Sequence, residues 1–270
     1  MGWLSRYVKY GPAFQSAQVE EKALPLSPCC ASLDGRTLLF FSDIHLCQRL
    51  PRPAVEKLLC QIEALEPDLL LLGGDYAESA DWQSEMFSLL GQLRAPLGKF
   101  GVLGNNDCEC FPDGVAPLIE AAENSGVTLL IDRAVRVDTG SGVIAVAGLD
   151  EYRQAKPLKK PLFSETDANA YRILLAHYPQ SIARYHLSGH PHPPHLALAG
   201  HTHGGQFNLL GLTPYSIGFE YRLLGTPLPI VSGWKTMGET SLLVSPGIGT
   251  SRIPVRINVE PSIHLLKLIK

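Results

Sequence analysis

Apolar runs that end in polar loops recur along the first half of the chain. They are predicted strands at 37–41, 69–72 and 99–103, which lead into Asp43, Asp75 and Asn105. Apolar residues at helical spacing predict helices over 53–65 and 82–93 between these strands. Helical crossovers imply parallel strands, whose carboxyl ends meet at one edge of a sheet. We therefore expect the functional residues at that edge.

The second half repeats the arrangement with histidines. Strands predicted over 171–176 and 195–199 lead into His177 and the segment Gly200–Gln206. The pattern also predicts a helix over 115–125 and strands near 127–131, 134–137, 143–148, 241–244, 255–259 and 264–268. No long linker separates the halves. We therefore expect one domain over residues 36–270, with residues 1–35 as an N-terminal extension packing on it.

Residues 1–12 mix apolar and basic side chains, so a helix here would be weakly amphipathic. A short docked helix or a frayed terminus is the favoured interpretation, and an interfacial membrane foothold is left open. The chain has no apolar run of about 18 residues and no signal-peptide layout. A cytoplasmic protein is expected, with peripheral membrane association as the alternative.

Composition excludes some classes of protein. The chain is 45% hydrophobic and 18% charged, which is typical of a globular protein. Its formal net charge of -3 argues against a broad nucleic-acid surface, which needs clustered basic residues. The 6 cysteines show no framework of the small secreted type, so reduced thiols are expected.

The strand ends carry residues with the chemistry of metal ligands. These are Asp43, His45, Asp75, Asn105, His177, His201 and His203. Two divalent ions about 3.5–4 Å apart need a bridging ligand, for which the carboxylate of Asp75 is suited. Oxygens mixed with imidazole nitrogens favour manganese, iron or zinc over calcium. Such a pair generates hydroxide from bound water and clamps a phosphate, so the cluster predicts hydrolysis of phosphate esters.

In the order of its motifs, the chain resembles the calcineurin-like metallophosphoesterases. The motifs are Asp43-Ile44-His45, Gly74-Asp75, Gly104-Asn105-Asn106-Asp107, His177 and Gly200-His201-Thr202-His203. The resemblance implies an α/β (α+β) fold, a four-layer αββα sandwich of two facing mixed β-sheets flanked by helices. It also implies two ions bridged by Asp75, one held by Asp43, His45 and His203, the other by Asn105, His177 and His201.

Two segments, Gly200–Gln206 and Gly249–Arg256, are similar to a bacterial branch of this family. The branch contains small phosphodiesterases and enzymes like UDP-diacylglucosamine pyrophosphatase, which implies a nucleotide-sugar or lipid-linked substrate. A nuclease or cyclic-nucleotide phosphodiesterase is the alternative. Arg222 and Arg252 are candidates to clamp a substrate phosphate, because guanidinium groups pair with phosphate in bidentate fashion. Surface salt bridges are an equal alternative for both.

The candidate catalytic residues are Asn106 and Asp107, where the chain departs from the family pattern. Most relatives have a histidine after the asparagine ligand, and it protonates the leaving oxygen. The amide of Asn106 cannot supply a proton at neutral pH. Pyrophosphates and activated diesters are therefore the predicted substrates, because their leaving groups depart unassisted. Two alternatives are left open: another group, such as His45, supplies the proton, or the chain is a catalytically weakened metal-binding scaffold.

Two further regions invite a functional interpretation. The first is a group of histidines interrupted by prolines, namely His186, His190, His192 and His195. No carboxylate stands nearby in the sequence, so a solvated loop is favoured over a second metal site. The second is the apolar stretch 207–234, which could accept a lipid tail or a nucleobase. Ordinary packing under a long loop is favoured there.

Overall fold

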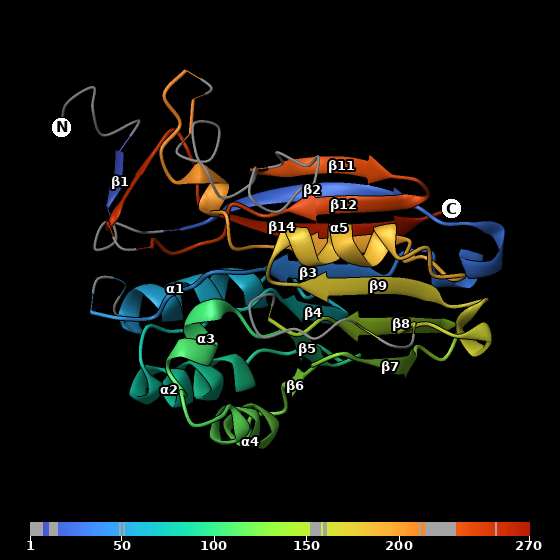
Figure 1. Cartoon of the computed structure of the whole chain (residues 1–270), viewed down its shortest axis with the longest axis horizontal. Helices are drawn as coiled ribbons and strands as arrows, with labels where there is room; N and C mark the ends of the chain where they lie inside the picture. Colours follow the sequence, from blue (N-terminus) through green and yellow to red (C-terminus); the bar gives the residue numbers. More distant parts are fainter. Residues whose placement is uncertain are drawn as a thin grey trace.

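A computed structural model of the chain shows two facing six-stranded sheets with helices on their outer faces (Figure 1). It describes residues 8–10, 16–48, 50, 52–151, 158, 161–210, 212–213, 231–251 and 253–270. This arrangement confirms the predicted αββα architecture. Among the described residues, no helix has both the length and the apolar character needed to cross a bilayer.

The first sheet has the strand order β2-β14-β3-β4-β5-β6. Its strands are β2 (Gln18–Pro25), β14 (Ser262–Ile269), β3 (Thr37–Phe41), β4 (Leu69–Leu72), β5 (Lys99–Gly101) and β6 (Thr128–Leu129). The run from β3 to β6 is parallel, whereas β14 is antiparallel to β3 and parallel to β2. The sheet is therefore mixed, and its four parallel strands end at a common edge.

The second sheet has the order β11-β12-β10-β9-β8-β7. Its strands are β11 (Gly233–Met237), β12 (Thr240–Val244), β10 (Leu196–Ala199), β9 (Tyr171–Ala176), β8 (Val143–Gly148) and β7 (Arg133–Asp138). The inner four are parallel, and β7 and β11 are antiparallel edge strands. Figure 1 shows the arrowheads of β8 and β9 pointing toward the side of the molecule that carries β1 and α3.

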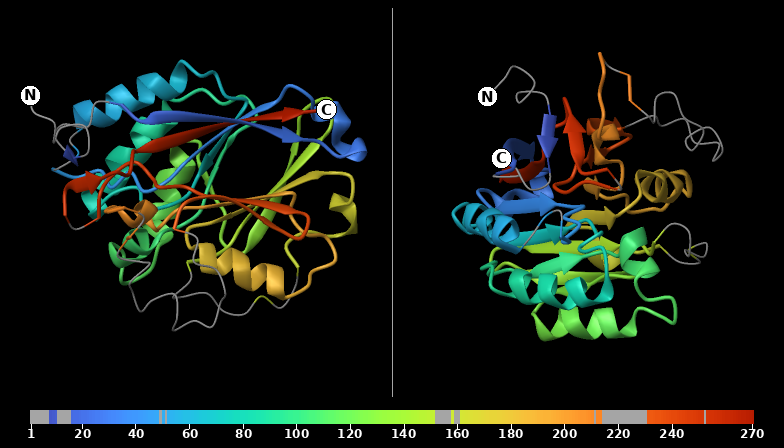
Figure 2. Two further views of the ribbon diagram at one scale, coloured as in Figure 1. Left: turned by 90° about the horizontal axis from the view of Figure 1, so that it is seen from above. Right: turned by 90° about the vertical axis from the view of Figure 1, so that its left-hand side faces the viewer.

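Three apolar layers hold the sheets and helices together. The first lies under the helices α1 (Arg52–Glu63), α2 (Ala80–Gly91) and α4 (Ala116–Asn124), the second between the sheets, and the third under α5 (Pro179–Leu187). Figure 2 shows the helices on the two outer faces. Strand β3 is apolar throughout because Leu39 and Phe41 face the helices while Leu38 and Phe40 face the other sheet.

The shorter elements lie at both ends of the strands. Helix α3 (Asn105–Glu109) follows β5, and 3-10 turns occur at Pro28–Leu33, Glu165–Asp167 and His203–Gly205. Strand β1 (Val8–Tyr10) pairs antiparallel with β13 (Val255–Ile257) in a sheet of their own.

The N-terminal region differs from the sequence-based expectation. Val8–Tyr10 was predicted as part of a helix or a frayed end, but it forms a strand because β13 offers it a pairing edge. The rest of residues 1–12 lies outside the described residues. Upstream of residue 36, the chain also contributes β2 to the first sheet. Residues 18–25 therefore form a strand of the first sheet.

Candidate metal centre

The predicted ligands converge where the parallel strands end. Asp43 and His45 follow β3, Asp75 follows β4, and Asn105 begins α3; His177 follows β9, and His201 and His203 follow β10. Positive φ angles occur at Asp43 (54°), His45 (50°), Asp75 (54°), His201 (71°) and His203 (50°). Such angles are uncommon for residues other than glycine, and they persist only where the surroundings enforce them. The backbone is thus strained at most of the ligand positions.

One group of ligand atoms consists of Asp43, His45 and His203, all buried and within 4.8 Å of one another. The Nε2 atoms of His45 and His203 are 3.2 Å apart, and His203 Nε2 lies 3.6 Å from Asp43 Oδ1. Two imidazole nitrogens and a carboxylate oxygen therefore face one point. This donor set matches the coordination preferences of a transition-metal ion.

A second group consists of Asp43, Asp75 and His177, also buried and within 4.8 Å of one another. Asp75 Oδ2 lies 3.4 Å from His177 Nε2 and 3.5 Å from His45 Nε2, which belongs to the first group. The same oxygen thus faces both groups, as a bridging carboxylate would. Asp43 is shared by both groups as well.

Asn105 and His201 complete the second group. His201 Nδ1 lies 3.1 Å from Asn105 Oδ1 and 3.2 Å from His177 Nε2. Tyr178 packs its ring against His201, with a centroid distance of 3.8 Å, and its hydroxyl donates to Asn105 Oδ1 at 3.3 Å. The structure thus brings together the whole predicted ligand set and adds Tyr178, which only its adjacency to His177 could have indicated.

Outer contacts orient the imidazoles. His177 Nδ1 donates to the carbonyl of Gly73 at 2.8 Å, so the lone pair of its Nε2 can coordinate a metal ion. On the other side, the buried Arg256 lies 3.3 Å from His203 Nδ1 and donates to the carbonyl of Gly249. The sequence motif Gly249–Arg256 contained this arginine, but nothing in its pattern showed that it contacts a ligand.

The electrostatics of the centre reflect burial and crowding. Burial acts to lower the pKa of His177, but the neighbouring carboxylate of Asp75 outweighs it and raises the pKa to about 10. Burial raises the pKa of Asp43, whereas for Asp75 the effect of burial is exceeded by His177 and His45, so its pKa is lowered. Burial lowers the pKa of Arg256 to about 10. The buried groups therefore depend on one another for charge compensation.

Asp107 is bound to the backbone of the ligand loops. Its two oxygens accept hydrogen bonds from the N–H groups of Asp75 (2.8 Å), Tyr76 (2.9 Å) and Gly104 (2.8 Å), and from Gln83 Nε2 (2.7 Å). Burial raises its pKa to about 6. With its oxygens engaged in this way, Asp107 positions the Asp75 loop and the start of α3.

Asn106 lies against the ligands themselves. Its backbone N–H donates to Asp75 Oδ1 at 2.9 Å, and its Nδ2 lies 3.1 Å from His45 Nδ1. Its Oδ1 accepts from the Asn105 amide at 2.8 Å. The side chain therefore helps to orient His45 and Asn105, and it carries no group that can protonate a leaving oxygen.

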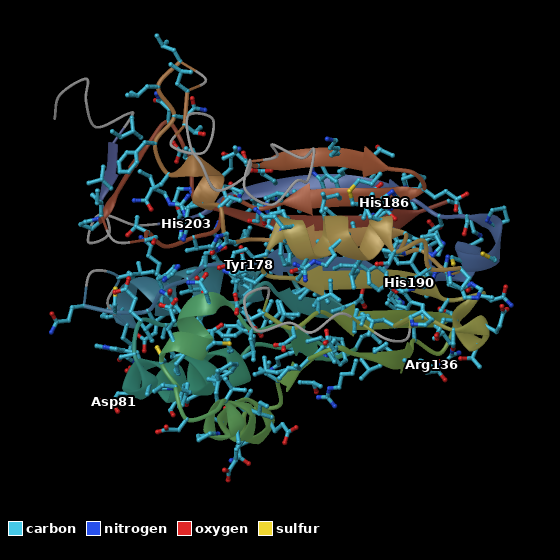
Figure 3. The ribbon with its side chains drawn as sticks, in the orientation of Figure 1. Asp81, Arg136, Tyr178, His186, His190 and His203 are labelled. Carbon is cyan, nitrogen blue, oxygen red and sulfur yellow. The ribbon has the colours of Figure 1, made fainter. Side chains whose placement is uncertain are left out.

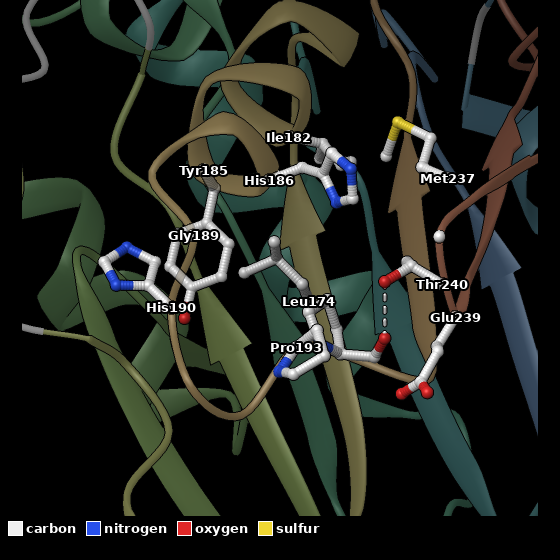
Figure 4. Close-up of a pocket in the computed structure, with 12 residues that line it drawn as sticks. Leu174, Ile182, Tyr185, His186, Gly189, His190, Pro193, Met237, Glu239 and Thr240 are labelled. Carbon is white, nitrogen blue, oxygen red and sulfur yellow. Dashed lines mark hydrogen bonds between the residues drawn. The ribbon is translucent and has the colours of Figure 1, made fainter.

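Two arginines and four histidines remain from the sequence analysis. Arg222 and Arg252 lie outside the described residues, as does most of the apolar stretch 207–234. His186 and His190 lie apart on the lining of an apolar cavity of about 270 Å³ (Figure 4). His192 pairs with Glu165 at 3.2 Å.

His195 belongs to a separate packing arrangement. Its ring stacks on Tyr171 with a centroid distance of 5.1 Å, and its Nδ1 accepts from the N–H of Arg172 at 3.0 Å. His190, His192 and His195 thus contact different partners, whereas His186 lies on α5. The four histidines form no common ligand set.

Comparison with known proteins identifies the family of the chain. The sequence model described as "Calcineurin-like phosphoesterase" matches residues 36–205. The metallophosphoesterase YkuE of Bacillus subtilis is 28% identical over 239 residues, covering 87% of this chain and 79% of the relative. The phosphodiesterase YaeI of Escherichia coli is 29% identical over 244 residues, covering 86% and 82%. The solved structure of the phosphopantetheinyl hydrolase PptH of Mycobacterium tuberculosis aligns with a TM-score of 0.43 and 13% identity, covering 83% of this chain and 96% of that one.

Proposed function

Because the chain belongs to the calcineurin-like phosphoesterase family, we propose that it hydrolyses phosphodiester or pyrophosphate bonds with two divalent metal ions, acting on a nucleotide-sugar or lipid-linked substrate. The observation that carries the proposal is the position of Asp75 Oδ2, which faces His45 of one ligand group and His177 of the other. A single oxygen between two donor sets is the arrangement that a pair of ions requires.

The donor set fits manganese, iron or zinc. Asp43, His45 and His203 would hold one ion, Asn105, His177 and His201 the other, with Asp75 between them. When bound, such a pair supplies an activated water as nucleophile and neutralises charge on the phosphate. The protein's own contribution is orientation: Gly73, Asn106 and Arg256 contact the outward nitrogens of three ligand imidazoles.

Asn106 narrows the class of substrate. Its amide is engaged with His45 and Asn105, and it cannot protonate an alkoxide leaving group. A nucleoside monophosphate or an aryloxide departs without that proton. We therefore place pyrophosphates and activated diesters ahead of alkyl monoesters.

A substrate panel tests this proposal. Bis-p-nitrophenyl phosphate, a nucleotide-diphosphate sugar and glycerol phosphate would be assayed with manganese, iron and zinc in turn. We expect turnover of the first two to exceed that of glycerol phosphate, and faster turnover of glycerol phosphate would contradict the proposal. Single-stranded DNA and a cyclic nucleotide in the same panel test the nuclease and cyclic-nucleotide alternative. Two bound ions without turnover of any substrate would favour the scaffold.

The substitution Asn106→His tests the role of the missing acid directly. A histidine there supplies a proton donor, and general acids typically contribute about 10²- to 10⁴-fold. We expect hydrolysis of glycerol phosphate to rise by about 100-fold, while the pyrophosphate substrate gains less than tenfold. Asn106→Gln serves as the control, because it retains an amide. An equal gain for both substrates would show that Asn106 does not set the preference for leaving groups.

Peripheral contact with a membrane, by a cytoplasmic protein, would suit a lipid-linked substrate. Its support is the turn after the His201–His203 motif, where Leu209, Leu210 and Leu212 have relative exposures of 58%, 104% and 60%. Replacing these three leucines with serine should reduce flotation with anionic liposomes. Leu187→Ser is the matched control, because Leu187 is 70% exposed on α5. Equal flotation of the two variants would remove this turn from the proposal.

A further inference from the structure

A series of three polar side chains, Glu20, His264 and Ser245, crosses the apolar layer between the two sheets beside the metal centre. His264 of β14 is buried, and its Nε2 lies 2.9 Å from Ser245 Oγ, which belongs to the segment after β12 in the other sheet. Its Nδ1 lies 3.4 Å from Glu20 Oε2 of β2. Burying such groups is costly unless each finds a partner. Packing alone therefore does not account for these three polar side chains.

Strand register places these groups on one face. His264 is paired with Glu20 on one side and with Phe40 of β3 on the other, so the three side chains project in the same direction. The rings of Phe40 and His264 stack with a centroid distance of 6.2 Å. His264 thus reaches into the inter-sheet layer and meets Ser245 from the facing sheet.

The hydrogen-bond directions are mutually consistent. Ser245 Oγ accepts from the N–H of Gly247 at 3.0 Å, so its single hydrogen is available to His264 Nε2. That leaves His264 Nδ1 on the side of Glu20, 3.4 Å from its carboxylate, in an ion-pair contact that lacks hydrogen-bond geometry. The order of hydroxyl, imidazole and carboxylate is one that activates nucleophiles elsewhere. Ser245, however, has a relative exposure of 0% and cannot reach a substrate. The three side chains must therefore act through the backbone segment that Ser245 contacts.

The segment that Ser245 begins holds both sides of Asp43. The N–H of Ile248 donates to the carbonyl of Ser42 at 3.1 Å, and the N–H of Gly249 donates to the carbonyl of Asp43 at 2.6 Å. A Cβ on Gly247 would lie 2.7 Å from the Cβ of Asp43, so only glycine permits this approach. Asp43 has the strained φ of 54° that aims its carboxylate into both ligand groups. Close backbone contact is what keeps a residue in such a conformation.

We propose that Glu20, His264 and Ser245 are positioning residues that hold Asp43 in its metal-binding conformation through the Gly247–Gly249 segment. The proposal rests on the proposed function in that it takes Asp43 as a metal ligand. Loss of the contacts among these three side chains frees the Gly247–Gly249 segment. Asp43 then relaxes toward an ordinary φ and withdraws its carboxylate. The consequence is weaker metal binding by a protein that is still folded.

The experiment compares Glu20→Gln, Ser245→Ala and His264→Asn with the parent chain. Manganese affinity is measured by calorimetry, and the geometry of the ligand set by the visible absorption of the cobalt-loaded protein. Loss of outer contacts to metal ligands costs about 10- to 100-fold in affinity, and more remote coupling costs less. We expect about tenfold weaker binding for His264→Asn and Ser245→Ala, about threefold for Glu20→Gln, and a shifted cobalt spectrum in all three.

The control is Glu21→Gln, which makes the same change of charge one residue along β2, where the side chain points to the other face and is exposed. It should bind metal like the parent. If His264→Asn fails to fold, Glu20→Gln carries the test, because the Glu20 side chain is 39% exposed on an edge strand. Folded variants with parental affinity and a parental cobalt spectrum would overturn the proposal.

These readouts need no turnover, so they separate the two proposals. Suppose that the parent protein hydrolyses none of the panel, but its variants bind metal more weakly. That result supports the positioning role and rejects the proposed function. Parental binding in the variants of an active enzyme does the reverse. A parent chain that binds no metal ion would overturn both.

Discussion

Two parts of the molecule are rich in histidine, yet only one gathers its side chains into a ligand set. At the metal centre, four histidines follow the ends of parallel strands: His45, His177 and His203 lie beside Asp43 or Asp75, and His201 lies beside His177. In the loop between α5 and β10, the histidines contact different partners. Figure 3 shows His203 and Tyr178 at one end of the molecule and His186 and His190 farther along it. Strand ends and carboxylates therefore make the site, whereas the number of histidines does not.

The substitution Asp75→Asn should break the metal centre most severely. The neutral amide cannot bridge two ions, so we expect metal affinity and turnover to fall by more than about 100-fold, beyond the loss typical of outer contacts. Elemental analysis after dialysis and kcat/KM on the preferred substrate measure the change. Asp81→Asn, at an exposed position on α2, is the control. Two tightly bound ions in the Asp75→Asn protein would show that Asp75 is not the bridge.

Removal of Asp107 should damage the scaffold of the centre. Asp107→Ala leaves three buried backbone N–H groups without their acceptor, and it removes one of the two acceptors of the Gln83 amide. Because each unsatisfied group costs about 1–3 kcal/mol, we expect the free energy of unfolding to fall by about 3–5 kcal/mol. Urea denaturation of the variant and of the exposed control Asp113→Ala measures it. A loss below 1 kcal/mol would mean that water replaces the carboxylate.

His195 should make the other histidine region sensitive to acid. Burial, assisted by the Arg172 guanidinium, lowers its pKa to about 4. The pKa in the folded state is thus below the unfolded value of about 6.5, so the stabilisation is complete above pH 6.5 and is lost as the pH falls toward 4. Urea denaturation at pH 7 and pH 4.5 should show a larger loss for the parent than for His195→Asn. Equal losses would contradict this account.

The smallest effect is expected from His186→Ala combined with His190→Ala. These side chains lie apart on an apolar cavity lining, so metal content and turnover should equal those of the parent. Elemental analysis before and after the double substitution checks this. Loss of one ion per chain would show that the loop does hold metal, and the contrast between the two regions would fail.

The sequence was sufficient to place the candidate ligands at strand ends, because each one stands in the loop that follows a strongly apolar run. Parallel pairing places Asp43 and Asp75 at the carboxyl edge of the first sheet, and His177 and His201 at the carboxyl edge of the second. The facing of the two sheets then brings these edges together. Family resemblance supplied the pairing of ligands with ions and the expected sandwich of sheets. Local pattern and topology therefore agreed at this site.

Roles that arise from distant contacts could not be predicted in this way. Asp107 binds backbone groups of a loop more than 25 residues away in the chain, and Arg256 reaches His203 from beyond β12. The hydrogen-bonding role of His264 likewise depends on Ser245 in the facing sheet. Strand β1 was missed because its pairing with β13 joins opposite ends of the chain and leaves no periodic signal. Tertiary neighbours decide all four cases.

The position of β14 has a consequence for the order in which a nascent chain can complete the centre. β14 lies between β2 and β3, although it is synthesised after every metal ligand. Until it emerges from the ribosome, β3 keeps an open edge, and the Asp43 loop lacks the contacts that run through Ser262 and Gly247. All the ligands are therefore made before the strand that completes the centre.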